Sequence, residues 1–384
     1  NFTLYCMNIF IFLTFYYMFI AFSTTLSLSG TMGCMNRPKY VMNRPKRTLN
    51  GSMRFNSKYS LKKSFRYYIL LLCPVKISYK VYTQKGFYMW IADHWKDYEV
   101  LDTSSGEKLE RWGDYILVRP DPQVIWKTPH DHKGWKQKNG HYHRSAKGGG
   151  EWEFFHLPDE WAIHYTLPFQ KEASGKTDPL TFHLKPFSFK HTGLFPEQAV
   201  NWDYTRKLIR ESGREEVKVL NLFAYTGAAT VACLKEGASV VHVDASKGMT
   251  QWAKENAKLS GVDGEDVRWI VDDCMKFVQR EIRRGNRYDI VILDPPSYGR
   301  GPKGEIWHLE DSIYDFVKLV SQVLSDEPIM VLLNSYTTGL SSSVMKYILD
   351  DVITKEKGGK VEADEIGLPV TSNGQVLPCG SSAI

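Results

Sequence analysis

Short apolar runs alternate with helix-like segments through the second half of the chain, and this alternation constrains the fold more than any other feature. The runs are rich in Val, Ile and Leu, as strands buried on both faces of a sheet are. Because parallel strands need crossover helices, the pattern predicts an open α/β fold with a mostly parallel sheet. The expected strands are 217–223, 239–243, 267–271, 288–293 and 329–333, and the expected helices are 228–236, 249–260 and 275–284.

The region before this pattern has a different composition. Residues 89–189 are rich in Trp, Tyr, His, Gly and Pro, with short candidate strands at 115–118 and 162–165. Glycine- and proline-containing turns separate these candidate strands. We therefore expect a smaller, mostly β domain over 89–189, followed by the α/β domain over 190–384.

The first 88 residues differ again. No Asp or Glu precedes Asp93, whereas residues 1–92 hold 13 Lys and Arg, which leaves 36 basic against 43 acidic residues for the remainder. The apolar segment 1–29 is followed by its basic stretch, which fits neither a signal peptide nor a transit peptide. We expect 1–88 to be a basic leader, with Met89 as the natural start. A membrane-spanning helix over 5–22 is the alternative.

The six cysteines form neither C-x-x-C pairs nor a regular framework. Such cysteines are typical of reduced thiols, so we expect a cytoplasmic protein.

Polar residues follow the expected strands where a ligand would bind, at the carboxyl ends of the sheet. The first strand ends in Asn221-Leu-Phe-Ala-Tyr-Thr-Gly227, where a glycine admits a close ligand and a helix N-terminus offers free N–H groups. Asp244 ends the second strand, where a carboxylate can accept both hydroxyls of a ribose. Asp272 and Asp273 end the third, where a side chain could receive the amino group of adenine.

A dinucleotide site is the competing interpretation of this turn. Such a site needs G-x-G-x-x-G, whereas the chain has a single glycine in Ala224-Tyr-Thr-Gly-Ala-Ala229. Without a pyrophosphate cradle, NAD is not expected.

The ordered set of motifs resembles the class I S-adenosylmethionine-dependent methyltransferases, in the branch of bacterial large-subunit (23S) ribosomal RNA enzymes that methylate cytosine C5. The segments that carry the resemblance are Lys190-His-Thr-Gly-Leu-Phe-Pro-Glu-Gln198, Asn221-Leu-Phe-Ala-Tyr-Thr-Gly-Ala228, Val241-His-Val-Asp-Ala-Ser246, Val271-Asp-Asp-Cys-Met-Lys-Phe277 and Asp294-Pro-Pro-Ser-Tyr298.

The resemblance implies a Rossmann-like sheet of seven strands, the last antiparallel, with 368–384 as its closing hairpin. It implies S-adenosyl-L-methionine as cofactor and RNA, in particular large-subunit ribosomal RNA, as partner. The cofactor-binding residues it implies are Lys190, Thr192, Gly193, Asn221, Phe223, Tyr225, Gly227, Asp244, Ala245, Ser246, Asp272, Asp273 and Asp294.

The acceptor motif Asp294-Pro-Pro-Ser-Tyr298 follows the fourth strand. Prolines donate no backbone N–H, so the Pro295 carbonyl is free to face the cleft beside the Asp294 carboxylate. Two adjacent acceptors suit an amino group, and Tyr298 can stack on a planar base. We expect Asp294, Pro295 and Tyr298 to be catalytic, unless the motif is only a rigid turn.

The chain departs from the resembled branch after strand five. Attack on cytosine C6 needs a thiolate, but the chain has Asn334-Ser-Tyr-Thr-Thr-Gly339 at that place. Cys274 and Cys379 lie elsewhere. Methylation of a ring or exocyclic nitrogen is therefore easier to reconcile with the sequence. Asn334 could contact the acceptor or could only end the strand.

Eight of the 11 histidines fall between His130 and His191, including His130-Asp-His132 and His141-Tyr-His143. With no cysteine or carboxylate at a suitable spacing, we predict no metal site. Cations alternate with aromatics over 127–147, which suits either RNA or a solvated loop. A methyltransferase for a small molecule or protein side chain, and a non-catalytic nucleotide-binding module, are the alternative functions.

Overall fold

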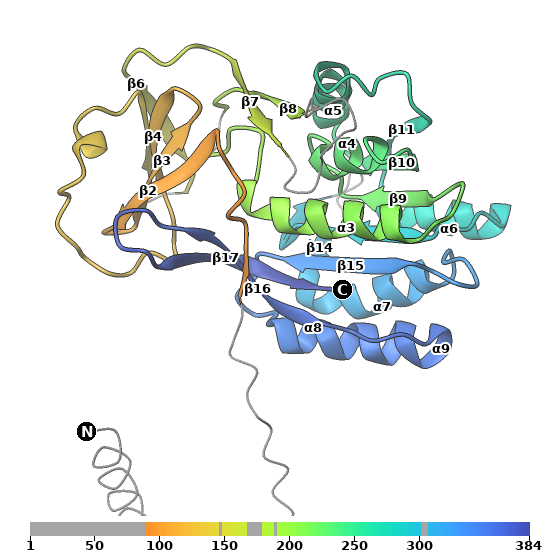
Figure 1. The fold of residues 1–384 in the computed structure, drawn as a ribbon. Helices are drawn as coiled ribbons and strands as arrows, with labels where there is room; N and C mark the ends of the chain where they lie inside the picture. The colour runs from red at the N-terminus through yellow and green to blue at the C-terminus, as the bar shows by residue number, and fades with distance from the viewer. Residues whose placement is uncertain (1–88, 146–147, 167–178, 188–189, 301–305) are drawn as a thin grey trace, which may run out of the picture. The chain divides into compact units, whose positions relative to one another are not determined.

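The computed structural model describes residues 89–145, 148–166, 179–187, 190–300 and 306–384 (Figure 1). The expected leader over 1–88 lies outside the described residues. Among the helices that are described, none combines the length and the apolar composition that a membrane span requires.

The larger sheet has eight strands in the order β1-β16-β17-β15-β12-β9-β10-β11. Strands β15, β12, β9, β10 and β11 are mutually parallel, and β17 is antiparallel to both of its neighbours. This confirms the Rossmann-like α/β fold, and β1 adds one short edge strand to the seven expected. The strands are β1 (Trp90–Ile91), β9 (Lys218–Leu222), β10 (Ser239–Asp244), β11 (Val267–Val271), β12 (Ile290–Leu293), β15 (Met330–Ser335), β16 (Ala363–Pro369) and β17 (Val376–Ala383).

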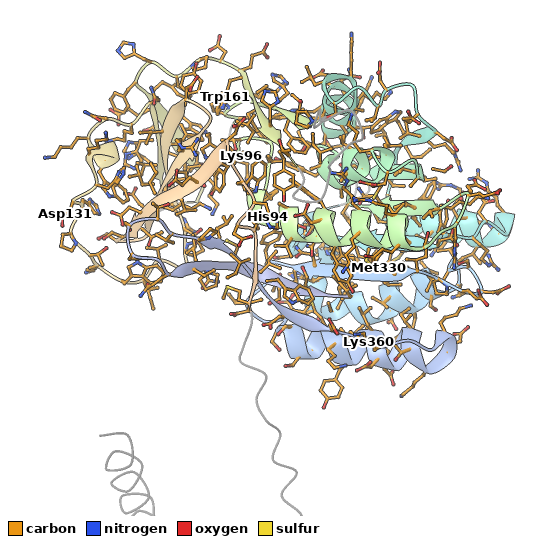
Figure 2. All side chains as sticks on the ribbon, viewed as in Figure 1. His94, Lys96, Asp131, Trp161, Met330 and Lys360 are labelled. Atoms are coloured by element: carbon orange, nitrogen blue, oxygen red, sulfur yellow. The ribbon has the colours of Figure 1, made fainter. Side chains whose placement is uncertain are left out.

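Helices cover both faces of this sheet (Figure 1), which explains why the central strand β12 is apolar and buried along its whole length. Alternate strand residues such as Val219 and Leu220 belong to the two separate cores, one under α3–α5 and one under α6–α8. Met330 is buried in one core, whereas Lys360 and Asp131 are exposed (Figure 2). The helices are α3 (Ala199–Glu211), α4 (Ala228–Leu234), α5 (Lys247–Leu259), α6 (Cys274–Arg284), α7 (Leu309–Ser321), α8 (Ser342–Leu349) and α9 (Lys355–Lys357), with short helical turns η1 (Lys133–Trp135), η2 (Pro196–Gln198) and η3 (Asp350–Thr354).

The smaller part is built of β strands, as its composition indicates. Five strands form a sheet in the order β2-β3-β4-β5-β6, and β7 pairs with β8 in a separate hairpin. Another hairpin, β13–β14, follows the acceptor motif. These strands are β2 (Tyr98–Ser104), β3 (Glu107–Trp112), β4 (Tyr115–Pro120), β5 (Gly140–Arg144), β6 (Gly150–Phe154), β7 (Trp161–Tyr165), β8 (Leu180–Leu184), β13 (Tyr298–Arg300) and β14 (Ile306–His308).

The two sheets share apolar contacts and hydrogen bonds. Trp112 and Phe182 of the smaller part belong to the same buried cluster as Val219 of the larger sheet. The β16–β17 turn also reaches β2, where the Thr371 N–H donates to the Val100 carbonyl over 2.9 Å. This hairpin begins at Ala363, earlier than the expected 368, because β16 pairs along its whole length with β17.

Candidate cofactor and acceptor site

A cleft opens where β9 and β12 end, bounded by α3 and the start of α4. Five of the expected site residues line it: Asn221, Phe223, Tyr225 and Gly227 come from the β9–α4 turn, and Asp294 comes from the end of β12. The other lining residues are Leu194, Phe195, Gln198, Asn201, Trp202, Thr205, Ala224, Thr226, Ala228, Ala229, Ile292 and Leu332.

The β9–α4 turn is a tight loop with an uncommon backbone. Phe223, Tyr225 and Gly227 have φ values of 57°, 51° and 79°, a region that side chains with a Cβ rarely adopt. At Gly227 the neighbouring chain is also close, because an added Cβ would lie 2.6 Å from the Ala253 Cβ of α5. The turn therefore needs glycine at 227, and its two left-handed aromatic residues need support from outside the loop.

Asp244 supplies that support. One carboxylate oxygen accepts the Tyr225 N–H and the other accepts the Ser246 N–H, both at 2.8 Å. Burial raises the pKa of Asp244, while these two backbone donors counteract the shift. Ala245 follows in the exposed turn, and Ser246 caps α5 by accepting the Met249 N–H. Asp244 is thus fixed beside the turn, and each of its oxygens retains a lone pair for a ligand hydroxyl.

The cleft fits the adenosyl cofactor that the sequence implies. Gly227 is the N-cap residue of α4, where no side chain caps the helix, and Asn221 is held by a hydrogen bond to Thr230. Among the described residues the buried Tyr225 hydroxyl has no hydrogen-bond partner, so a polar ligand atom in the cleft could satisfy it.

Eight expected cofactor residues lie outside the lining of this cleft: Asp244, Ala245 and Ser246, described above, and Lys190, Thr192, Gly193, Asp272 and Asp273. The Lys190 ammonium donates to the Pro120 carbonyl in a neighbouring cavity. Thr192 is fully buried, and Gly193 packs against the Trp252 ring while its carbonyl accepts the Thr226 hydroxyl. Of these three residues, Gly193 contacts the cleft lining through Thr226.

The two acidic residues after β11 are engaged by α6. Asp272 forms an ion pair with Arg280. Asp273 caps α6 by accepting the Lys276 N–H at 2.9 Å, which is the ordinary role of an Asp at that position. In this structure both carboxylates therefore stabilise α6.

Asp294 belongs to a closed ring of hydrogen bonds, which we call the Asp294 ring. One carboxylate oxygen accepts from Asn334 at 2.8 Å, and the other faces the Gln198 amide at 3.4 Å. Asn201 donates to Gln198 at 2.7 Å and to Ser382 at 3.0 Å, and Ser382 donates back to Asn334 at 2.8 Å. The ring fixes the carboxylate at the edge of the cleft.

Desolvation dominates the electrostatics of Asp294. Burial raises its pKa to about 6, and the nearby Glu197 carboxyl acts in the same direction. The Asn334 hydrogen bond opposes both effects. A carboxylate with this pKa is poised to exchange a proton near neutral pH.

The rest of the acceptor motif lies beside the cleft. Pro295 is buried, and Tyr298 begins the β13–β14 hairpin with 46% of its surface exposed. Its ring contacts His308 edge-on, with centroids 5.1 Å apart. Tyr298 therefore presents about half of its surface to solvent beside the acceptor motif.

Sequence reasoning missed the residues that hold Asp294 in place. Gln198, Asn201 and Ser382 come from η2, α3 and β17. Gln198 also donates to the Tyr336 hydroxyl at 2.8 Å. Of these residues only Gln198 lies in a segment that carried the family resemblance, as the last residue of 190–198.

The described cysteines near the site are not activated. Burial raises the pKa of the Cys274 thiol, which accepts the Phe223 N–H, and raises that of Cys379 well above its ordinary value. Both are protonated at neutral pH and are poor nucleophiles.

The aromatic residues expected to contact RNA are mostly packed inside the smaller part. Trp135 and Tyr142 are buried, and the Trp135 ring nitrogen donates to Asp102. Trp126 donates to the Thr103 carbonyl. Within 127–145 the side chains of Lys127, Lys133, Lys136 and Arg144 are exposed to solvent, whereas the Trp135 and Tyr142 rings are not.

Comparison with known proteins finds S-adenosylmethionine-dependent methyltransferases. A family described as S-adenosylmethionine-dependent methyltransferase matches residues 176–313. The crystal structure of the SAM-dependent methyltransferase from Agrobacterium tumefaciens is similar with a TM-score of 0.68 and 33% identity, covering 77% of this chain and 92% of that one.

Two curated relatives match over shorter regions. Ribosomal RNA large subunit methyltransferase K/L from Shewanella baltica (strain OS155 / ATCC BAA-1091) is 30% identical over 218 residues, which are 53% of this chain and 28% of that protein. Ribosomal RNA large subunit methyltransferase K from Neisseria meningitidis serogroup B is 31% identical over 166 residues, 43% of this chain and 44% of that protein. The chain thus spans less than half the length of either relative.

Proposed function

The chain belongs to the S-adenosylmethionine-dependent methyltransferases, and we propose that it transfers the methyl group to a nitrogen of a ribosomal RNA base in the cytoplasm. One observation carries the proposal: Asp294 both lines the cofactor cleft and begins the acceptor motif. Methyl donor and acceptor would therefore meet at this carboxylate. The names of the two curated relatives support ribosomal RNA as the substrate class.

The cofactor side of the reaction rests on the β9–α4 turn. S-adenosylmethionine supplies an electrophilic methyl group on its sulfonium. We assign Asp244 to the ribose hydroxyls, because it is fixed by two backbone N–H groups and keeps free lone pairs. Gly227 lets the turn take its left-handed backbone without crowding α5, and Asn221, Phe223 and Tyr225 line the cleft.

On the acceptor side, Asp294 and the Pro295 carbonyl would accept hydrogen bonds from an amino group and orient its lone pair toward the methyl group. Since the pKa of Asp294 is about 6, its carboxylate can take the proton that the nitrogen loses. Alignment of the two reacting atoms supplies much of the rate in such a displacement. Tyr298 would stack on the base.

Nitrogen is favoured over cytosine C5 because the described chain lacks an activated thiol at the site. Cys274 and Cys379 are both held protonated by burial. A C5 transfer would need one of them as thiolate.

Mass spectrometry of ribosomal RNA nucleosides tests the proposal. RNA from cells without the gene is incubated with the full chain and isotopically labelled S-adenosylmethionine. We expect label in one base, on nitrogen, and an Asp294→Ala chain should lose about 10²–10³-fold in kcat. Label only in protein or small molecules would refute the RNA substrate, and label on cytosine C5 would refute the assigned atom.

Two variants of Tyr298 test whether the acceptor motif is catalytic or only shapes the turn. Tyr298→Phe keeps the ring face and should be mild, whereas Tyr298→Ala should lower kcat strongly. Cofactor affinity and thermal stability should change little in both. Loss of stability in parallel with activity would show that the residue only shapes the turn.

A further inference from the structure

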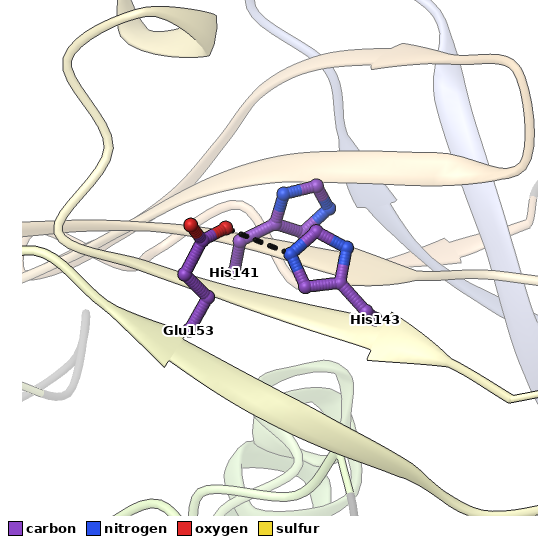
Figure 3. Close-up of side chains that lie close together, drawn as sticks. All are labelled: His141, His143 and Glu153. Carbon is purple, nitrogen blue, oxygen red and sulfur yellow. Dashed lines mark hydrogen bonds and ion pairs between the residues drawn. The ribbon is translucent and has the colours of Figure 1, made fainter.

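Imidazole and carboxylate groups gather on one face of the five-stranded sheet, outside the cofactor cleft. His141 and His143 are two residues apart on β5, so their side chains point to the same face. Glu153 of β6 is in register opposite His141, which brings its carboxylate to the same place (Figure 3).

The candidate ligand atoms of these three residues all lie within 4.8 Å of one another. His143 Nε2 is 2.9 Å from a Glu153 carboxylate oxygen, and the two imidazole centroids are 3.9 Å apart. A second carboxylate comes from Glu107 at the start of β3, with an oxygen 2.6 Å from His141 Nε2.

We propose that His141, His143 and Glu153 bind a divalent transition-metal ion such as Zn²⁺, with Glu107 as the fourth ligand. Neutral imidazole nitrogens and carboxylate oxygens are ligands that zinc takes in tetrahedral sites, whereas Ca²⁺ and Mg²⁺ prefer oxygen alone. Zinc–ligand bonds of about 2.0–2.2 Å place the ligand atoms of a tetrahedron roughly 3.4 Å apart. The ligand atoms of His141, His143 and Glu153 lie within 4.8 Å of one another, so they must move closer together to bind an ion.

The exposure of the site agrees with this assignment. The side chains of His143 and Glu153 are 47% and 52% exposed, which leaves them free to rotate and gives an ion access. His141 and Glu107 are less exposed, at 15% and 29%, and provide the fixed side of the site. A bound ion would cross-link β3, β5 and β6, of which β3 is separated from β5 in the sheet by β4.

Zinc titration of the metal-free full chain by calorimetry tests the proposal, with Co²⁺ as a spectroscopic substitute. We expect one ion per chain and a visible Co²⁺ spectrum typical of tetrahedral coordination. His143→Ala and Glu153→Gln should each weaken binding by at least ~10-fold. His164→Ala, which removes an exposed histidine of β7 outside the cluster, is the matched control and should bind like the unaltered chain.

Circular dichroism and S-adenosylmethionine affinity establish that each variant is folded. Absence of saturable zinc binding by the unaltered chain would overturn the proposal. So would equal isotherms for the unaltered chain and His143→Ala, because the ion would then be bound elsewhere.

Discussion

The side-chain amide of Asn334 donates to the carboxylate of Asp294 over 2.8 Å, and this contact joins the carboxyl ends of β15 and β12. The Ser382 hydroxyl donates to the Asn334 carbonyl oxygen, so the amide nitrogen must face Asp294. Asn334 is fully buried, and it is therefore a positioning residue for Asp294 instead of a contact to the acceptor.

This contact predicts how activity depends on pH. Since the pKa of Asp294 is about 6 and its ionised form is the acceptor, kcat should rise with pH and level off above about 7. Asn334→Ala removes a hydrogen bond that favours the ionised form, so the inflection should move to higher pH. The pH profile of kcat at saturating substrate measures both. If the inflection stays at the same pH in Asn334→Ala, Asp294 is not the group whose ionisation the profile reports.

Asp244 and Asp273 form a matched pair for cofactor binding. Asp244→Ala should weaken S-adenosylmethionine binding by about 1.5–3 kcal/mol, because bonds to the ribose and support for the turn are both lost. Asp273→Ala removes a helix cap and should cost about 1 kcal/mol of stability. Calorimetry and thermal unfolding separate the two effects. Reduced cofactor affinity in Asp273→Ala would show that its second oxygen also reaches the adenine.

Alanine variants at Gly227 and Gly237 distinguish the cost of steric crowding from the cost of backbone strain. Both have φ close to 79°, but an added Cβ meets Ala253 at position 227 and nothing within 4 Å at position 237. Gly237→Ala should therefore cost only strain, about 1 kcal/mol, whereas Gly227→Ala should add about 1–3 kcal/mol of overpacking. Denaturant unfolding of the two variants measures the difference, and equal costs would contradict it. Cofactor affinity should fall only in Gly227→Ala.

The two cysteines near the site should not form a covalent intermediate. Because burial keeps both thiols protonated, Cys379→Ala and Cys274→Ser should retain most of the activity. RNA that contains 5-fluorocytosine provides the direct test, since it traps a cysteine adduct. A complex that survives denaturation and disappears in either variant would establish a thiolate mechanism.

Local patterns determined the strands and the cofactor end of the sheet. The expected strand 267–271 has the same bounds as β11, and the helix expected at 275 begins one residue earlier because Asp273 caps it. Such signals work because burial on both faces leaves an uninterrupted apolar run, and a tight turn needs its glycine in sequence order.

The register of the smaller sheet could not be predicted from the same signals. No metal site was expected at the histidine pairs, because no carboxylate lies near them in sequence at the spacing that metal ligands usually have. Strand pairing places Glu153 opposite His141, and β3 brings Glu107 to the same face. Pairing of this kind depends on turn geometry and on packing against the core.

By itself, then, the sequence determined an α/β sheet with Gly227, Asp244 and Asp294 at the ends of its strands. Only the tertiary structure decided which groups hold Asp294, because the contacts of the Asp294 ring join residues far apart in the chain. Asn334 is 40 residues from Asp294, and Asn201 is 181 residues from Ser382. Hydrogen bonds over such separations form only after the strands and α3 have packed, so no local pattern encodes them.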